Sequence, residues 1–128
     1  MLFFLPAIFW MGLISYLSSR QDVPNMQELF KHADKLAHFI VYLILGIWLT
    51  LGTFVFFEIK VLFKKLIVLT IGISFALTDE FHQSFVPNRV PDIYDFFADV
   101  VGIFGSLIFF NVIVKTITQI FNKINFKL

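Results

Sequence analysis

Ionisable and hydrogen-bonding side chains gather between residues 79 and 99 of a chain that is otherwise rich in apolar residues. This segment reads DEFHQSFVPNRVPDIYDFFAD and contains five carboxylates, one histidine and the only arginine after Arg20. Carboxylates and histidine can exchange protons or hold a cation, whereas arginine can bind a phosphate through two parallel hydrogen bonds. Ionisable groups at membrane depth are costly and therefore mark functional candidates. The sequence thus predicts a polar functional site in this segment.

A second polar stripe lies earlier in the chain. Asp34, His38 and Tyr42 follow one another at intervals of four residues, with Lys35 beside the first of them. Residues at this spacing share one face of a helix. The stripe begins at Asp34, just before an apolar segment, and continues along that segment. We therefore expect it to start at a membrane surface and descend inward.

The segment 79–99 repeats this spacing twice. Asp79 and Gln83 are four residues apart, Glu80 and Gln83 are three apart, and Asp95 and Asp99 are again four apart. Such pairs lie on one helix face. Three helices could therefore line one polar pocket. We expect its ligand-binding residues to be Asp34, Lys35, His38, Tyr42, Asp79, Glu80, Gln83, Arg89, Asp95 and Asp99.

The net charge of this pocket is negative. Five carboxylates (Asp34, Asp79, Glu80, Asp95 and Asp99) outnumber two cations, so the pocket carries about −3 when all are ionised. Carboxylates at close range repel one another, and a bound cation or a shared proton would relieve that repulsion. The sequence itself assigns no metal ligands and identifies no cofactor.

Three interpretations of the pocket remain open. In the first, Arg89 and Lys35 hold a phosphate of a lipid or glycan while the acids accept hydrogen bonds from sugar or ammonium donors. In the second, the protein is an enzyme for a lipid-linked substrate, with Glu80 or Asp79 as base and His38 as acid or proton shuttle, with or without a divalent metal on oxygen ligands. In the third, the charged residues form an ion-pair network that only holds the helices together.

Composition indicates the broad class. Hydrophobic residues make up 59% of the 128 residues and charged residues 15%, against roughly 25% charged in soluble domains. Since each spanning helix needs about 20 residues, we predict one all-α domain over residues 1–128, an integral membrane four-helix bundle. The expected helices cover 2–18, 36–57, 66–85 and 93–114, with an amphipathic tail at 115–128. We also expect Asp92 to cap the fourth helix.

Other classes of protein lack support. Without cysteine there is no disulfide, zinc-thiolate site or iron–sulfur cluster. No basic stripe points to nucleic acid, so we expect no nucleic-acid partner. Six Lys and Arg residues lie in the 58–65 turn and the tail, against four in the two opposite loops. The positive-inside rule then places both termini in the cytoplasm of a multi-pass protein of the bacterial inner membrane, with the acids outside.

The order of the polar groups resembles the VanZ-like family. Its members share an outer D-K-x-x-H-F helix start, then D-E-x-x-Q-x-F-x-P-x-R, then D-x-x-x-N-x-x-G. The residues that match are Asp34, Lys35, His38, Phe39, Asp79, Glu80, Gln83, Phe85, Pro87, Arg89, Asp95 and Gly102. Asp99 stands where the family pattern has Asn. The resemblance covers about residues 34–105 and implies a small membrane protein of the cell envelope associated with teicoplanin resistance.

Together these observations predict an outward-facing pocket that engages membrane lipids or an amphiphilic, lipid-linked envelope molecule, with an effect on glycopeptide (teicoplanin) susceptibility. Two alternatives stay open. One is a membrane enzyme whose catalytic candidates are Glu80, Asp79 and His38. The other is a structural or assembly subunit that binds a membrane-protein partner.

Overall fold

A computed structural model describes residues 2–20, 32–87, 89 and 91–125. Every regular element within these ranges is helical, which confirms the predicted all-α class for the described residues. In chain order the elements are the 3-10 turn η1 (Leu2–Phe4), α1 (Leu5–Ser18), α2 (Ala33–Phe56), α3 (Val61–Gln83), α4 (Ile93–Ile108) and α5 (Phe110–Asn125).

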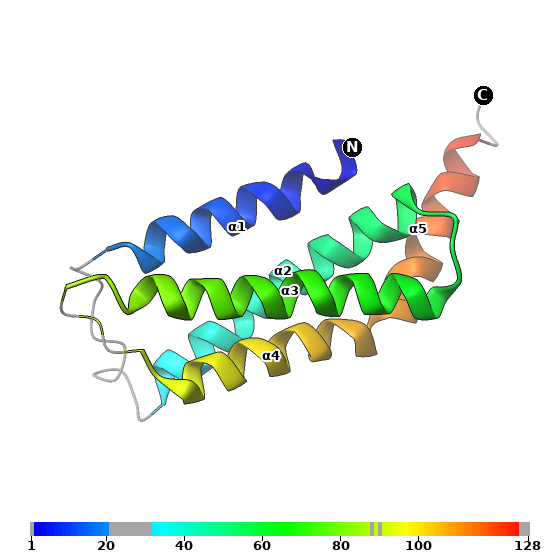
Figure 1. Ribbon diagram of the computed structural model, residues 1–128. Helices are drawn as coiled ribbons and strands as arrows, with labels where there is room; N and C mark the ends of the chain where they lie inside the picture. Colours follow the sequence, from blue (N-terminus) through cyan, green and yellow to red (C-terminus); the bar gives the residue numbers. More distant parts are fainter. Residues whose placement is uncertain (1, 21–31, 88, 90, 126–128) are drawn as a thin grey trace.

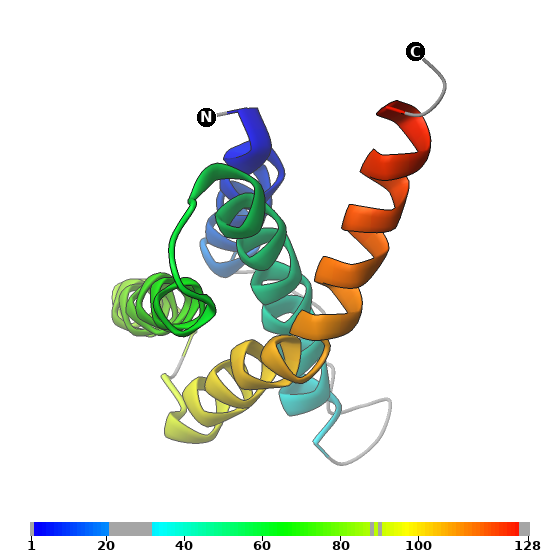
Figure 2. The ribbon, with the colours of Figure 1, turned by 90° about the vertical axis from the view of Figure 1, so that its right-hand side faces the viewer.

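Helix α2 is the centre of the arrangement, because it packs against α1, α3 and α4 (Figure 1). The turn from α2 to α3 lies at one end of the molecule and the connection from α3 to α4 at the other. α5 turns away from the remaining helices, as Figure 2 shows. The chain thus brings the start of α2, the end of α3 and the start of α4 to the same end.

Within the part of the chain that the structure describes, two helices are long and apolar enough to cross a membrane. α2 has 24 residues and α3 has 23. α1 and α4 have 14 and 16 residues, fewer than the roughly 20 that span the hydrocarbon core of a bilayer. The arrangement of four spanning helices therefore stays a prediction.

α3 begins five residues earlier than expected, at Val61, because its first turn accommodates a lysine. Lys64 is only 8% exposed, and its ammonium donates a hydrogen bond to the carbonyl oxygen of Phe54 at 3.2 Å. The same ammonium lies 4.6 Å from the centre of the Phe54 ring, an additional cation–π attraction. The basic segment that predicted a turn is thus partly helical.

The predicted fourth helix, 93–114, is interrupted at Phe109, so its last residues belong to a separate helix. α4 ends at Ile108, and α5 begins at Phe110 rather than at 115. Phe110 is 1% exposed, and the ammonium of Lys65 lies 5.3 Å from the centre of its ring. This packing is a tertiary effect that a continuous apolar pattern does not report. The last three residues of the predicted tail, 126–128, lie outside the described residues.

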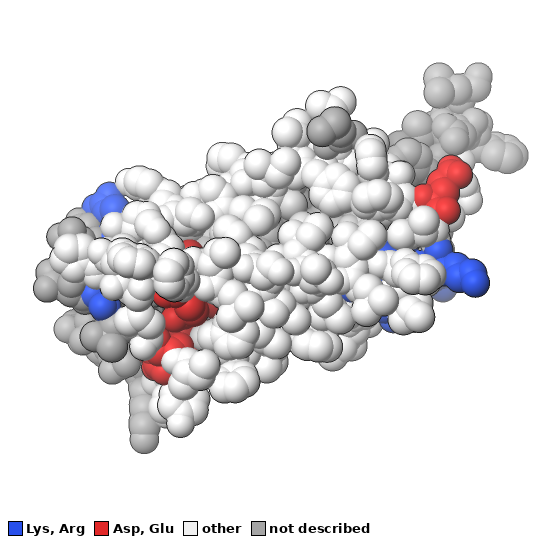
Figure 3. Space-filling model, viewed as in Figure 1, with Lys and Arg blue, Asp and Glu red and all other residues white. Residues whose placement is uncertain are grey.

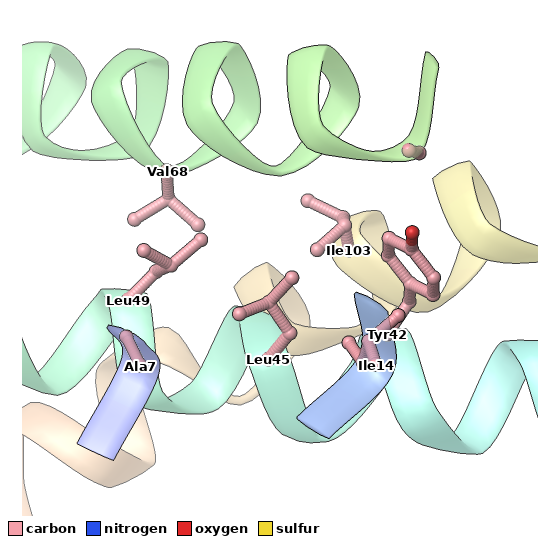
Figure 4. Packing of buried hydrophobic residues seen from close by; sticks show 8 residues of the cluster. Ala7, Ile14, Tyr42, Leu45, Leu49, Val68 and Ile103 are labelled. Carbon is pink, nitrogen blue, oxygen red and sulfur yellow. The ribbon is translucent and has the colours of Figure 1, made fainter. Parts of the chain in front are cut away.

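The hydrophobic core contains side chains from four helices (Figure 4). Its buried members are Ala7, Ile14, Tyr42, Leu45, Leu49, Val68, Ala76 and Ile103. In lipid, helices associate through close packing and small residues rather than through removal from water. The core therefore fixes how α1, α3 and α4 are placed around α2.

Gly102 is the residue that lets α4 approach α2 closely. A Cβ atom at this position would lie 2.5 Å from the carbonyl oxygen of Phe39 and 2.9 Å from the amide nitrogen of Leu43. Both are backbone atoms of α2, so they cannot rotate aside. This approach places the polar face of α4 directly against the polar stripe of α2.

The start of α4 is fixed by a side-chain cap. The Asp92 carboxylate accepts a hydrogen bond from the backbone N–H of Tyr94 at 2.9 Å, which confirms the predicted cap. Asp95 and Asp99 then follow within the first two turns of the helix.

Candidate functional site

The predicted polar residues lie mainly at the end of the molecule where α2 and α4 begin and α3 ends. In Figure 3 acidic atoms gather toward this end, and the surface between the two ends is largely uncharged. Because the helices around it are apolar, each polar group here must find a partner in the protein, in the solvent or in a ligand.

Lys35 is surrounded by carboxylates from two helices. Its ammonium lies 2.8 Å from Asp34 Oδ2, 2.5 Å from Asp92 Oδ2 and 2.7 Å from Asp95 Oδ1. The hydrogen bond from Lys35, together with the backbone N–H of Tyr94, holds the pKa of the Asp92 carboxyl below its usual range. Carboxylates at the start of a helix are also favoured by the helix dipole. This network joins the first turns of α2 and α4.

A second contact between α2 and α4 joins His38 to Asp99. The distance from His38 Nδ1 to Asp99 Oδ1 is 2.9 Å, and Asp99 is completely buried. If Asp99 is ionised, its carboxylate can only accept hydrogen bonds, and His38 Nδ1 then carries the proton of this contact. His38 Nε2 lies 3.9 Å from Asp95 Oδ2. The imidazole is thus oriented by acids of α4.

Asp79 connects α1 to α3. Its Oδ2 atom accepts hydrogen bonds from Ser18 Oγ at 2.9 Å and from Gln83 Nε2 at 3.2 Å, and the residue is 4% exposed. Sequence analysis did not single out Ser18. The signal for it was its position at the end of the first apolar segment, at the same end of the molecule as the acids.

Arg89 lies apart from the carboxylates. Its guanidinium donates to the carbonyl oxygens of Arg20 at 3.3 Å and Leu17 at 3.2 Å. These are carbonyls at the end of α1, where helices leave acceptors unsatisfied. The structure gives Arg89 a role in holding α1, and among the described residues it forms no ion pair with an acid.

Two carboxylate oxygens at this end have no hydrogen-bond partner among the described residues. Glu80 Oε1 and Asp99 Oδ2 are buried, and no described residue donates a hydrogen bond to either of them. Ligand atoms of His38, Glu80 and Asp99 all lie within 4.8 Å of one another. The sequence pattern assigned no metal ligands. These three residues, which we call the trio, nevertheless have side chains that can bind a metal ion.

The structure therefore sorts the ten predicted ligand-binding residues into groups. Eight lie in the polar contacts just described: Asp34, Lys35, His38, Asp79, Glu80, Gln83, Asp95 and Asp99. Tyr42 is 1% exposed and belongs to the hydrophobic core, and Arg89 holds the end of α1. Asp92, expected only as a cap, also pairs with Lys35. That these residues bind a ligand stays a prediction.

Comparison with known proteins identifies a family. A family model described as VanZ/LLP1 matches residues 3–115, which include α1 to α4 and every residue of the polar end. No curated protein matches the chain, and no solved structure matches it.

Proposed function

The chain belongs to the VanZ/LLP1 family, and from this premise we propose that it binds the polar head of an amphiphilic or lipid-linked envelope molecule at its acidic end. Family membership and two helices of spanning length support a membrane protein. The proposal adds a location for the ligand, at the junction of α2, α3 and α4.

The observation that carries this proposal is the unbalanced acidity of the site. The Lys35 ammonium forms ion pairs with the acids at the start of α2 and α4. Among the described residues no Lys or Arg forms an ion pair with Asp79, Glu80 or Asp99. A buried acceptor without a donor costs about 1–3 kcal/mol, and more when it is charged. A ligand with ammonium, amide or hydroxyl donors would remove that cost.

The surroundings of Glu80 suit a ligand with an apolar tail. Phe81 and Phe85 are 68% and 69% exposed, and their ring centres are 5.0 Å apart. Neighbouring exposed apolar rings form a surface that can contact lipid chains or another apolar partner. An amphiphile could then place its head among the acids while its chain stays in the hydrocarbon.

The distribution of Lys and Arg supports a location for the site in the envelope. From the positive-inside rule we infer that the acidic end lies outside the bacterial inner membrane and that both termini lie in the cytoplasm. A protein that holds a lipid-linked envelope molecule there would change how much of it a glycopeptide can reach, which would affect susceptibility to teicoplanin. A membrane-protein partner is compatible with this role.

A catalytic role is the second candidate, and one contact favours it. The hydrogen bond between His38 and Asp99 orients an imidazole beside Glu80, an arrangement suited to proton transfer. If the protein is an enzyme, an added lipid-linked substrate will be converted by the wild type and not by Glu80→Gln.

Native mass spectrometry in mild detergent tests the binding proposal. Wild type, Glu80→Gln and the control Glu58→Gln would be purified in parallel and their bound lipids compared. Glu58 is exposed and lies in the turn between α2 and α3, so its substitution removes the same charge far from the site. We expect a lipid adduct on wild type and Glu58→Gln that is lost from Glu80→Gln. Equal adducts on all three proteins would contradict the proposal.

A further inference from the structure

We propose that His38, Glu80 and Asp99 form a binding site for a divalent transition-metal ion such as Zn²⁺ or Mn²⁺. One ligand comes from each of three helices: His38 from α2, Glu80 from α3 and Asp99 from α4. The ion would thereby connect three helices that are far apart in sequence.

The distances within the trio are close to those of a metal site. If three atoms lie 4.8 Å apart, the point between them is about 2.8 Å from each. Nitrogen and oxygen ligands bind Zn²⁺ at about 2.0–2.2 Å. Side-chain movements of less than about 1 Å would therefore close the site. Binding through His38 Nδ1 would require the ion to displace the proton of the 2.9 Å hydrogen bond between Nδ1 and Asp99 Oδ1.

Burial supplies an independent reason to expect an ion. Asp99 is 0% exposed and its Oδ2 atom has no donor among the described residues. Glu80 Oε1 is likewise buried and has no donor among the described residues. Buried carboxylates are normally paired with cations or coordinate metals. Carboxylates on the surface need no such partner because water solvates them, whereas these two oxygens are shielded from solvent.

The types of ligand select the class of metal. Imidazole favours Zn²⁺ and its neighbours in the first transition series, whereas Mg²⁺ and Ca²⁺ prefer sites made of oxygen alone. Three protein ligands leave at least one coordination position open on Zn²⁺. The side chain of His38 is 20% exposed, so the open position can be reached from outside the bundle.

The neighbouring contacts hold the ligands in place. Lys35 binds Asp95 one turn before Asp99, and Ser18 and Gln83 bind Asp79 next to Glu80. Outer contacts of this kind orient metal ligands and influence affinity. They fix the helices that carry the trio whether or not an ion is bound.

A bound ion would also change which head groups the site accepts. Lys35 is occupied by carboxylates and Arg89 by carbonyl oxygens. The metal would then provide the positive charge that a phosphate or carboxylate head group needs. This second step rests on the proposed function, whereas the metal site itself does not.

Titration with metal salts, without added lipid, tests the site. Protein purified with EDTA and freed of it would be titrated with ZnCl₂, MnCl₂ and MgCl₂ by calorimetry, and with CoCl₂ by visible absorption. We expect one ion per chain, with Mg²⁺ bound least tightly. Glu80→Gln and Asp99→Asn should each weaken binding by at least about tenfold. His38→Gln should change the Co²⁺ spectrum, because the imidazole nitrogen is lost.

Glu58→Gln is the matched control, because it removes the same charge as Glu80→Gln from the exposed turn between α2 and α3, far from the trio. The metal affinity of this variant should stay within about threefold of the wild type, since the field of a distant surface charge is largely screened. No saturable binding to the wild type, or equal losses of affinity in Glu58→Gln and Glu80→Gln, would overturn the metal site. If Asp99→Asn fails to fold, Glu80→Gln still provides the test, because Glu80 is partly exposed. Metal binding without a lipid adduct would instead refute only the proposed head-group function.

Discussion

Replacement of Gly102 by alanine should separate α4 from α2 and disturb the polar site at the same time. The new Cβ would lie 2.5 Å from the carbonyl oxygen of Phe39, where ordinary contacts begin at 3.4 Å. α4 must therefore withdraw by about 0.9 Å. Asp99 lies one turn before Gly102, so the same movement would lengthen its 2.9 Å contact with His38 to about 3.8 Å, beyond hydrogen-bond range.

The energetic cost follows from two opposing effects. Overpacking of this kind costs about 1–3 kcal/mol. Alanine is a better helix former than glycine by about 0.8–1.0 kcal/mol, which offsets part of that cost. We expect Gly102→Ala to lose up to roughly 2 kcal/mol of unfolding free energy, with a fall of up to several degrees in melting temperature.

Gly105→Ala is the matched control on the same helix. A Cβ there would meet the side chains of Leu43 at 3.4 Å and Phe39 at 3.7 Å, which are ordinary contacts, so this variant should be as stable as the wild type or slightly more stable. Thermal unfolding followed by circular dichroism in detergent compares the two variants, and zinc titration reports the site. If Gly102→Ala melts at or above the temperature of Gly105→Ala and binds metal equally well, the argument from close packing is wrong.

Three further variants test the polar contacts by thermal unfolding in detergent. Ser18→Ala removes a donor from the buried carboxylate of Asp79 and should cost about 1–2 kcal/mol; an unchanged melting temperature would refute this contact. Lys35→Gln leaves Asp92 and Asp95 without their lysine partner and should lower the free energy of unfolding by about 1–2 kcal/mol. This cost is smaller than for a fully buried pair because the network is partly exposed to solvent. A variant more stable than the wild type would contradict the assigned role of Lys35. The pKa of Asp92 is lowered in the folded state, so its charge stabilises the fold above the unfolded pKa of 3.8. The stability difference between wild type and Asp92→Asn should therefore be constant above that pH and disappear as the pH falls further, whereas a difference that grows in acid would reverse the assigned sign.

Much of the polar end could be predicted because helical spacing decides which residues share a face. His38 does contact Asp99 of α4, Asp34 shares the Lys35 ammonium with Asp92 and Asp95, and Asp92 does cap that helix. The same spacing placed Asp95 and Asp99 together. These predictions depend only on local geometry, which the sequence determines directly.

The remaining features depend on tertiary contacts that spacing does not report. Arg89 has a long side chain, and its guanidinium reaches the end of α1 rather than the acids near it in sequence. The change of direction at Phe109 depends on the burial of Phe110. The trio combines residues of three helices, so no motif in a single segment could define it.

An Asp99→Asn variant distinguishes a structural contact from a metal site. The VanZ-like pattern has Asn at this position, so the substitution restores the residue type of that pattern. Without metal, an Asn of the same shape removes a buried charge that lacks a full set of partners, so Asp99→Asn should be more stable than the wild type. With Zn²⁺ at 100 times its dissociation constant, binding would add about 2.7 kcal/mol to the wild type alone. The order of the two melting temperatures should therefore reverse when metal is added. If Asp99 served only to bind His38, the variant would be less stable in both conditions, and added metal would not change the order.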